Sequence, residues 1–306
     1  MRTVRTGDIR HIGPRDVLLV VLTACGFGSS FLFIKMIVPE IPPVTLAMGR
    51  SLVSLTTLLL VLWLSGHRLP RPGPVWWPIC IMGMTAQVVP MILLSWGQQQ
   101  IPSGLAGIIL GSVPVVTLVL AHLLMHDERM SLRALLGALI GFVGVVAVIG
   151  AGALGLADTA VLAEFAVFGA AMAITFANVL ARRIGPLPPV VLAVGSQLAA
   201  LVILLPLSLA VDQPWELHPG RAALGSLVVL GVVGSAIPSL LFLRLLMRVG
   251  ATRASLAAYL VPLVAVLLGA LVLDERLPWS TLVGMVLILI GALLVNRRIV
   301  TPTAGS

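Results

Sequence analysis

The triplet Asp127-Glu128-Arg129 closes a long apolar run, and 147 positions later the same triplet, Asp274-Glu275-Arg276, closes another. Residues around both triplets also repeat, at offsets between 146 and 148. The repeated residues are Gly137 with Gly284, Gly144 with Gly291, Pro90 with Pro238, Pro114 with Pro262, and Pro42-Pro43-Val44 with Pro188-Pro189-Val190. Offsets this constant predict that the chain consists of two related halves.

The composition places both halves in a membrane. Hydrophobic residues make up 59% of the 306 residues and charged residues 10%, whereas soluble domains carry roughly 45–50% and about 25%. A membrane helix needs roughly 20 apolar residues. Ten such runs follow one another, at 16–37, 44–65, 75–97, 103–125, 132–152, 160–181, 188–211, 221–243, 254–273 and 279–296. We therefore expect an all-α integral membrane protein with ten transmembrane helices.

Each half holds five of these runs, an odd number, so the second half must be inverted relative to the first. The expected organisation is a cytoplasmic N-terminal segment at 1–15, a five-helix repeat at 16–152, a second at 160–298 and a cytoplasmic tail at 299–306. Inverted repeats are typical of secondary transporters, which bind their substrate near the membrane midplane between the repeats.

The basic residues are distributed unevenly between the loops. With the N-terminus inside, 15 of the 19 Lys and Arg residues lie on or near the cytoplasmic side, and the other four are Lys35, Arg50, Arg221 and Arg276. Such a bias is typical of multi-pass proteins with cytoplasmic termini, here in a bacterial-type inner membrane. It also accounts for the net charge of +8 without nucleic acid as a partner.

The first run carries the motif Gly26-Phe27-Gly28-Ser29-Ser30-Phe31-Leu32-Phe33-Ile34-Lys35. With the duplicated Asp-Glu-Arg ends, it resembles the EamA-type members of the drug/metabolite transporter superfamily, although Cys25 stands where that family usually has Trp. Arg50, Glu128 and Glu275 also match the family. The resemblance covers roughly residues 15–298, and it implies a ten-helix exporter or permease of small metabolites without identifying the substrate.

Polar side chains form stripes on four of the expected helices. We interpret one residue from each as a candidate substrate contact: Gln87, Asn178, Ser235 and Tyr259. The alternative for each is an ordinary hydrogen bond between helices. Four prolines that recur in both halves are candidate helix breaks or gating positions, with a static kink as the alternative: Pro90, Pro114, Pro238 and Pro262.

Charged residues within the runs are few. Lys35 and Arg50 are expected to reach the interface with their long side chains or to pair with Glu40. The carboxylate nearest to a central membrane position is Glu164, about one turn into its run, so both proton coupling and uncoupled transport stay open. The pairs Gly107–Gly111 and Gly137–Gly141 predict close helix packing, within one chain or between chains.

The favoured function is secondary transport by alternating access between the two repeats, with export of amino acids, related compounds or drugs. A flippase for lipids or lipid-linked sugars is the alternative. A membrane acyltransferase using His122 and Asp127 is remote, because the repeat places Gly269 where His122 stands. We expect no catalytic residue, cofactor or metal. The expected partners are a small-molecule substrate and the lipid bilayer, with a monomer favoured over an oligomer.

Reporter fusions test the expected orientation. Because both termini should be cytoplasmic, green fluorescent protein fused after Ser306 should fluoresce, and alkaline phosphatase fused there should be inactive. Phosphatase activity from the C-terminal fusion would contradict the arrangement.

Overall fold

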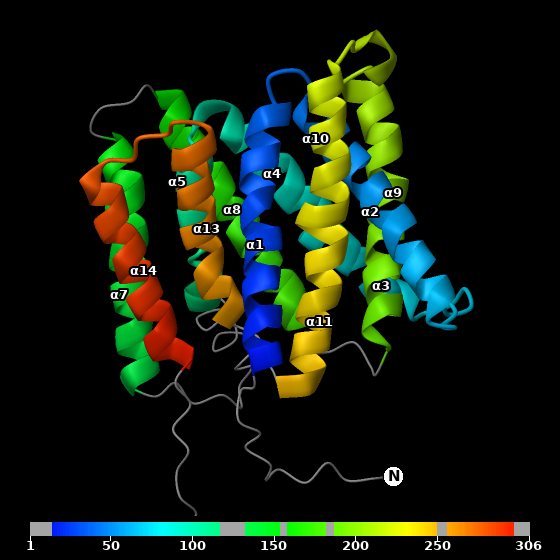
Figure 1. Cartoon of the computed structure of the whole chain (residues 1–306), viewed down its shortest axis with the longest axis horizontal. Coiled ribbons are helices and arrows are strands. Elements are labelled where there is room, and N and C mark those ends of the chain that lie inside the picture. The colour runs from blue at the N-terminus through cyan, green and yellow to red at the C-terminus, as the bar shows by residue number, and fades with distance from the viewer. Residues whose placement is uncertain (1–13, 117–131, 154–157, 182–186, 250–255, 297–306) are drawn as a thin grey trace, which may run out of the picture.

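The computed structural model describes residues 14–116, 132–153, 158–181, 187–249 and 256–296, and the regular structure within these ranges is entirely helical (Figure 1). The first half contains α1 (Pro14–Ile37), α2 (Pro43–Leu64), α3 (Trp76–Gly83), α4 (Val89–Gln100), α5 (Ser103–Leu110) and α7 (Leu132–Ala153). The second half contains α8 (Asp158–Ala181), α9 (Pro189–Val211), α10 (Arg221–Gly231), α11 (Ile237–Val249), α13 (Leu256–Val272) and α14 (Trp279–Asn296).

Three short segments complete the described helices. The π-helical segments η1 (Met84–Val88) and η3 (Val232–Ala236) join α3 to α4 and α10 to α11, and the 3-10 turn η2 (Pro214–Glu216) precedes α10. Within the described ranges, six helical stretches are long and apolar enough to cross a membrane, and four shorter apolar helices accompany them. The expected all-α membrane fold is confirmed.

The two halves run in opposite directions through the bundle. α1 begins and α14 ends at one face, which we call the terminal face (Figure 1). α8, the counterpart of α1, begins at the opposite face, which we call the distal face (Figure 1). The described helices therefore form the two inverted five-helix repeats that the sequence predicts.

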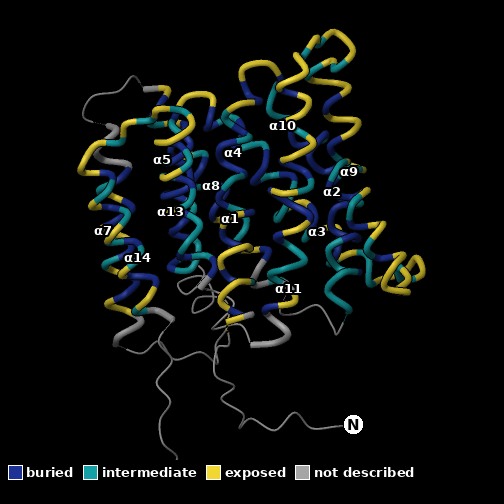
Figure 2. The backbone as a smooth tube through the Cα atoms, viewed as in Figure 1, coloured by how far each residue is buried: buried dark blue, intermediate teal, exposed yellow. Residues whose placement is uncertain are grey.

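The outside of the bundle is suited to lipid. Buried positions run along the helix sides that face other helices, and exposed positions lie on the periphery (Figure 2). Exposed tryptophans lie at or beside helix ends: Trp63 near the end of α2, Trp77 at the start of α3, Trp215 in the turn before α10 and Trp279 at the start of α14. Because Trp is favoured at membrane–water interfaces, these residues delimit the membrane-embedded part.

Glycines bring the backbones of α7 and α14 into contact. A Cβ atom on Gly144 would lie 2.8 Å from the carbonyl oxygen of Gly284, and one on Gly291 would lie 2.5 Å from that of Gly137. Lipid provides no hydrophobic force between membrane helices, so close packing through small residues drives their association. The Gly137–Gly141 pair therefore packs within the chain.

α13 lies between α1 and α5 and packs against both. A Cβ atom on Gly28 of the opening motif would lie 2.6 Å from the Cβ of Val264. On the other side, a Cβ atom on Gly111 would lie 2.7 Å from the ring of Pro262. Gly28 of the opening motif thus allows α1 to pack closely against α13 of the second half.

Substitution of Gly291 tests the α7–α14 packing. Gly291→Val should lower the free energy of unfolding by at least the 1–3 kcal/mol typical of overpacking, because the new side chain would meet the α7 backbone. Thermal unfolding of the purified protein in detergent measures the change. Gly225→Ala is the control, because no atom lies within 4 Å of its Cβ position. Equal melting temperatures for the two variants would contradict the packing.

Candidate functional site

The two π-helical segments occupy equivalent positions in the two halves. They are 148 residues apart, and each is followed by a proline at the second residue of the next helix, Pro90 in α4 and Pro238 in α11. A proline lacks the N–H for the normal bond and clashes with the preceding turn, and a π-bulge absorbs that distortion. These segments hold two of the predicted substrate contacts, Gln87 and Ser235.

Each π-segment faces the other half of the protein. η1 packs against α8 and α9, whereas η3 packs against α1 and α2. A Cβ atom on Gly83, just before η1, would lie 2.6 Å from the Ser196 carbonyl oxygen. At the equivalent Gly231, just before η3, it would lie 3.3 Å from the Arg50 carbonyl oxygen. The repeat symmetry therefore extends to individual backbone contacts between the halves.

Arg50 is the charged residue at this interface. Its side chain is buried, with 7% of its surface exposed, and its Nε donates a hydrogen bond of 2.5 Å to Ser235 Oγ. Nη1 is buried and has no hydrogen-bond partner. Ser235 in turn donates to the Leu230 carbonyl oxygen at 3.1 Å, so the serine fixes the orientation of the guanidinium.

This arrangement differs from the one expected for Arg50. Glu40, the expected partner, is exposed and accepts a hydrogen bond from the backbone N–H of Gly220. A signal in the sequence could have indicated the difference. At the offset of 146 that relates Pro42 to Pro188, Arg50 corresponds to Ser196. Because the second half has an uncharged serine at this position, the packing that both halves share does not require the charge of Arg50.

Further polar contacts join the halves near Arg50. Ser30 of the opening motif donates to the Gly234 carbonyl oxygen in η3 at 2.7 Å. Gln197 of α9 donates through Nε2 to Ser54 Oγ of α2 at 3.1 Å, and its Oε1 has no partner. Carbonyls in π-segments and buried amides are therefore available on both sides of the interface.

The other predicted contacts lie elsewhere or outside the described side chains. Tyr259 is buried beside Val115 and Ala138, and its hydroxyl donates to the Ala292 carbonyl oxygen at 2.8 Å. Asn178 belongs to α8, but its side chain is not among those described. Gln87 is half-buried in η1. Ser235 therefore lies beside the guanidinium of Arg50, whereas Tyr259 is bonded to α14.

The remaining two prolines have different surroundings. α5 ends at Leu110, and helical residues resume at 113–116 around Pro114. Pro262 lies inside α13, which continues through it. Whether these prolines act in gating stays a prediction.

The repeated Asp-Glu-Arg triplet has a clear role in the second half. Asp274 adopts a left-handed backbone conformation (φ +53°) two residues after the end of α13, and the Glu275 N–H donates to the Gly269 carbonyl oxygen at 3.0 Å. The Glu275 carboxylate then accepts hydrogen bonds from Ser103 N (2.7 Å), Ser103 Oγ (3.0 Å) and Gly104 N (3.0 Å). The triplet therefore ends one helix and caps the start of α5 in the other half.

Two more carboxylates on the distal face connect the halves in the same way. Asp212 accepts from Thr45 N at 2.7 Å and Thr45 Oγ1 at 2.9 Å, at the start of α2. Glu40 accepts from Gly220 N at 2.6 Å, just before α10. A carboxylate satisfies the free N–H groups of a helix start and complements its dipole. These contacts hold the distal ends of the halves together.

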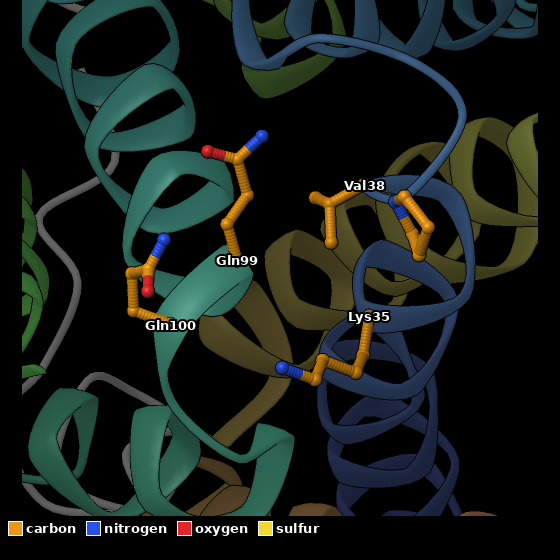
Figure 3. Close-up of a pocket in the computed structure, with 5 residues that line it drawn as sticks. Lys35, Val38, Gln99 and Gln100 are labelled. Atoms are coloured by element: carbon orange, nitrogen blue, oxygen red, sulfur yellow. The ribbon is translucent and has the colours of Figure 1, made fainter.

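Lys35 also acts at the distal face. Its Nζ donates to the carbonyl oxygens of Gln98 (2.7 Å) and Ile101 (2.9 Å), which closes the C-terminal end of α4. The side chain borders a cavity of about 410 Å³ that Val38, Pro39, Gln99 and Gln100 also line. Figure 3 shows the ammonium group directed from α1 toward α4. These bonds give Lys35 a structural role at the end of α4, and they differ from the expected pairing with Glu40, which binds Gly220 instead.

The described polar side chains between the halves are hydrogen-bonding groups. Within the ranges described, no three His, Cys, Asp or Glu side chains are grouped so that they could hold a metal ion. The acyltransferase pair His122 and Asp127 lies outside the described residues, as does Glu128. Two inverted repeats that meet along buried polar groups define the architecture of a secondary transporter.

Comparison with known proteins agrees with this architecture. The EamA-like transporter family matches residues 15–150 and 161–297, and the chain belongs to this family. A crystal structure of a protein superposes with a TM-score of 0.67 over 93% of this chain and 99% of that chain. At 19% sequence identity this likeness shows the fold alone.

Several relatives carry names as transporters. A "Probable terminal-alkyne amino-acid exporter" of Streptantibioticus cattleyicolor is 29% identical over 88% of this chain and 89% of that protein. The "Uncharacterized inner membrane transporter YedA" of Escherichia coli K12 is 28% identical over 79% of this chain and 78% of that protein. The chain is thus a multi-pass membrane transporter and not an enzyme.

Loss of the Glu275 carboxylate should weaken the distal contacts. Glu275→Ala removes the acceptor for three donors at the start of α5 and should cost about 0.5–2 kcal/mol of stability, as for other helix caps. Thermal unfolding in detergent measures the loss. Glu216→Ala is the control, because Glu216 is exposed. An unchanged melting temperature for Glu275→Ala would contradict the capping role.

Proposed function

We propose that the protein exports a small metabolite with a carboxylate group, an amino acid or a close relative, by alternating access between its two repeats. The observation that carries the proposal is Arg50, a buried cation between the halves with an unpartnered Nη1. It lies seven residues into α2, roughly 10 Å from the distal end at 1.5 Å per residue.

A buried guanidinium needs a counter-charge. Removing an ion from water costs several kcal/mol unless a partner compensates. Among the described residues, the one side-chain acceptor bonded to Arg50 is the neutral hydroxyl of Ser235. Arginine is suited to carboxylates and phosphates, because its planar group presents parallel donors. A substrate carboxylate would supply the missing charge.

The same charge argues against cationic drugs as substrates. A positive substrate next to Arg50 would meet like-charge repulsion in a poorly screened site. The phosphate of a lipid-linked sugar would satisfy the guanidinium as well as a carboxylate does, so the flippase alternative is distinguished by experiment. Support for the amino-acid class comes from the relative named as an amino-acid exporter.

Alternating access is supported by the inverted repeats, in which binding sites lie between the halves. The groups placed there come from both halves: Arg50 from the first and Ser235 from the second. A relative movement of the halves would change the surroundings of a substrate held between them. We place this cycle in an inner membrane with both termini in the cytoplasm.

Exchange assays in proteoliposomes test the role of Arg50. The probe is an equimolar mixture of radiolabelled proteinogenic L-amino acids. A charged hydrogen bond contributes about 1.5–3 kcal/mol, so Arg50→Gln should lower exchange at limiting substrate roughly ten- to hundredfold. Arg50→Lys should retain part of it, because the charge remains.

Arg276→Gln is the matched control, because Arg276 is exposed on the distal face. Equal exchange by Arg50→Gln and Arg276→Gln would contradict the role of Arg50. Absence of amino-acid exchange in the wild type, together with flipping of a fluorescent polyprenyl-phosphate sugar, would favour the flippase.

A further inference from the structure

Glu164 is a carboxylate inside the membrane for which the contacts above provide no role. It lies six residues into α8, roughly 9 Å from the distal end of that helix. Its side chain is 0% exposed, and neither Oε1 nor Oε2 has a hydrogen-bond partner. Together with Ala160, Ala163 and Val167 it forms the buried stripe of α8. Such a group is costly in a bilayer and calls for a function.

α4, which packs against α8, contains two more buried polar side chains without partners. Gly97 brings α4 against α8, because a Cβ atom there would lie 2.5 Å from Val167 Cγ2 and 3.0 Å from the Ala163 carbonyl oxygen. Next to this contact, Ser95 and Gln98 are 0% exposed, and their side-chain polar atoms have no partner. Spaced three apart, they lie on one side of α4, which is not the side on which Gly97 meets α8.

No described cation neutralises Glu164 from the helices packed on α8, which are α3, α4, α5, α7 and η1. α4, α5 and η1 contain no ionisable residue, and α3 contains the exposed Cys80. Arg133 begins α7 at the terminal face, and Asp158 begins α8; neither side chain is described. Beyond these helices, Lys35 binds carbonyl oxygens at the end of α4, and Glu275 caps α5.

An ionised carboxylate in these surroundings would lose its hydration without gaining a donor or a counter-charge, at a cost of several kcal/mol. A carboxylic acid is neutral, so burial costs it far less. One proton satisfies this requirement. Separation of α4 from α8 would admit water, and the acid would then release H⁺ and leave a carboxylate.

We propose that Glu164 is a proton-binding site that couples transport to the proton gradient. It holds one proton while the α4–α8 contact is closed, and it releases that proton when the contact opens during the cycle. The coupling to export rests on the proposed function, whereas the proton site does not.

Infrared titration of the purified, substrate-free protein tests the proton site, with H⁺ as the probe. The wild type should show a titrating protonated-carboxyl band that Glu164→Gln loses, because the amide has nearly the same shape without an acidic proton. Glu164→Asp should shift that band and keep it. The matched control Glu216→Gln, at an exposed carboxylate, should leave it unchanged. The same titrating band in Glu164→Gln would overturn the site.

Proteoliposome efflux of the radiolabelled L-amino-acid mixture tests the coupling. An imposed pH gradient should accelerate wild-type and Glu216→Gln efflux severalfold, whereas the acceleration for Glu164→Gln should fall to about onefold with amino-acid exchange retained. Equal acceleration in Glu164→Gln, or none in the wild type, would overturn the coupling. If the wild type moves no amino acid, the proposed function fails, and the infrared titration still decides the proton site.

Discussion

The contact between the Glu275 carboxylate and the start of α5 shows how the two halves are joined. In a bilayer the hydrophobic effect cannot hold one helix against another, so polar groups at helix ends carry more of the specificity. Glu275 belongs to the second half and satisfies the N–H groups of Ser103 and Gly104 in the first. Asp212 and Glu40 make similar contacts. All three lie on the distal face, so a separation of the halves there has to break charged hydrogen bonds.

Most of the fold could be predicted from the sequence, because bilayer thickness fixes the length of an apolar run. The expected runs 16–37 and 279–296 correspond to α1 (Pro14–Ile37) and α14 (Trp279–Asn296). Which helices pack against each other was harder to predict from the sequence. The glycines of α7 predict close packing against another helix, but glycine alone does not specify which helix that is. The π-segments were equally hidden, since Pro90 and Pro238 predict a distortion without its form.

The candidate site was predictable only in part. Ser235 was selected for its polarity and does lie at the interface of the halves, beside Arg50. The contact joins residues 185 positions apart, and a helical stripe gives no information about the helix that it faces. Arg50 was expected at the membrane surface because a long side chain can usually reach it. Here the packing of α2 against η3 keeps it buried.

The close correspondence of the two backbones has a consequence for energetics. Gly83 on Ser196 and Gly231 on Arg50 are the same contact made twice, once in each orientation. If the halves were identical in sequence, a form open to one side and a form open to the other would be related by a two-fold rotation and equal in free energy. A preference for one of these two forms must therefore come from positions at which the halves differ in sequence, such as Arg50 in the first half and the equivalent Ser196 in the second. The sidedness of the transporter is a property of that divergence rather than of the fold.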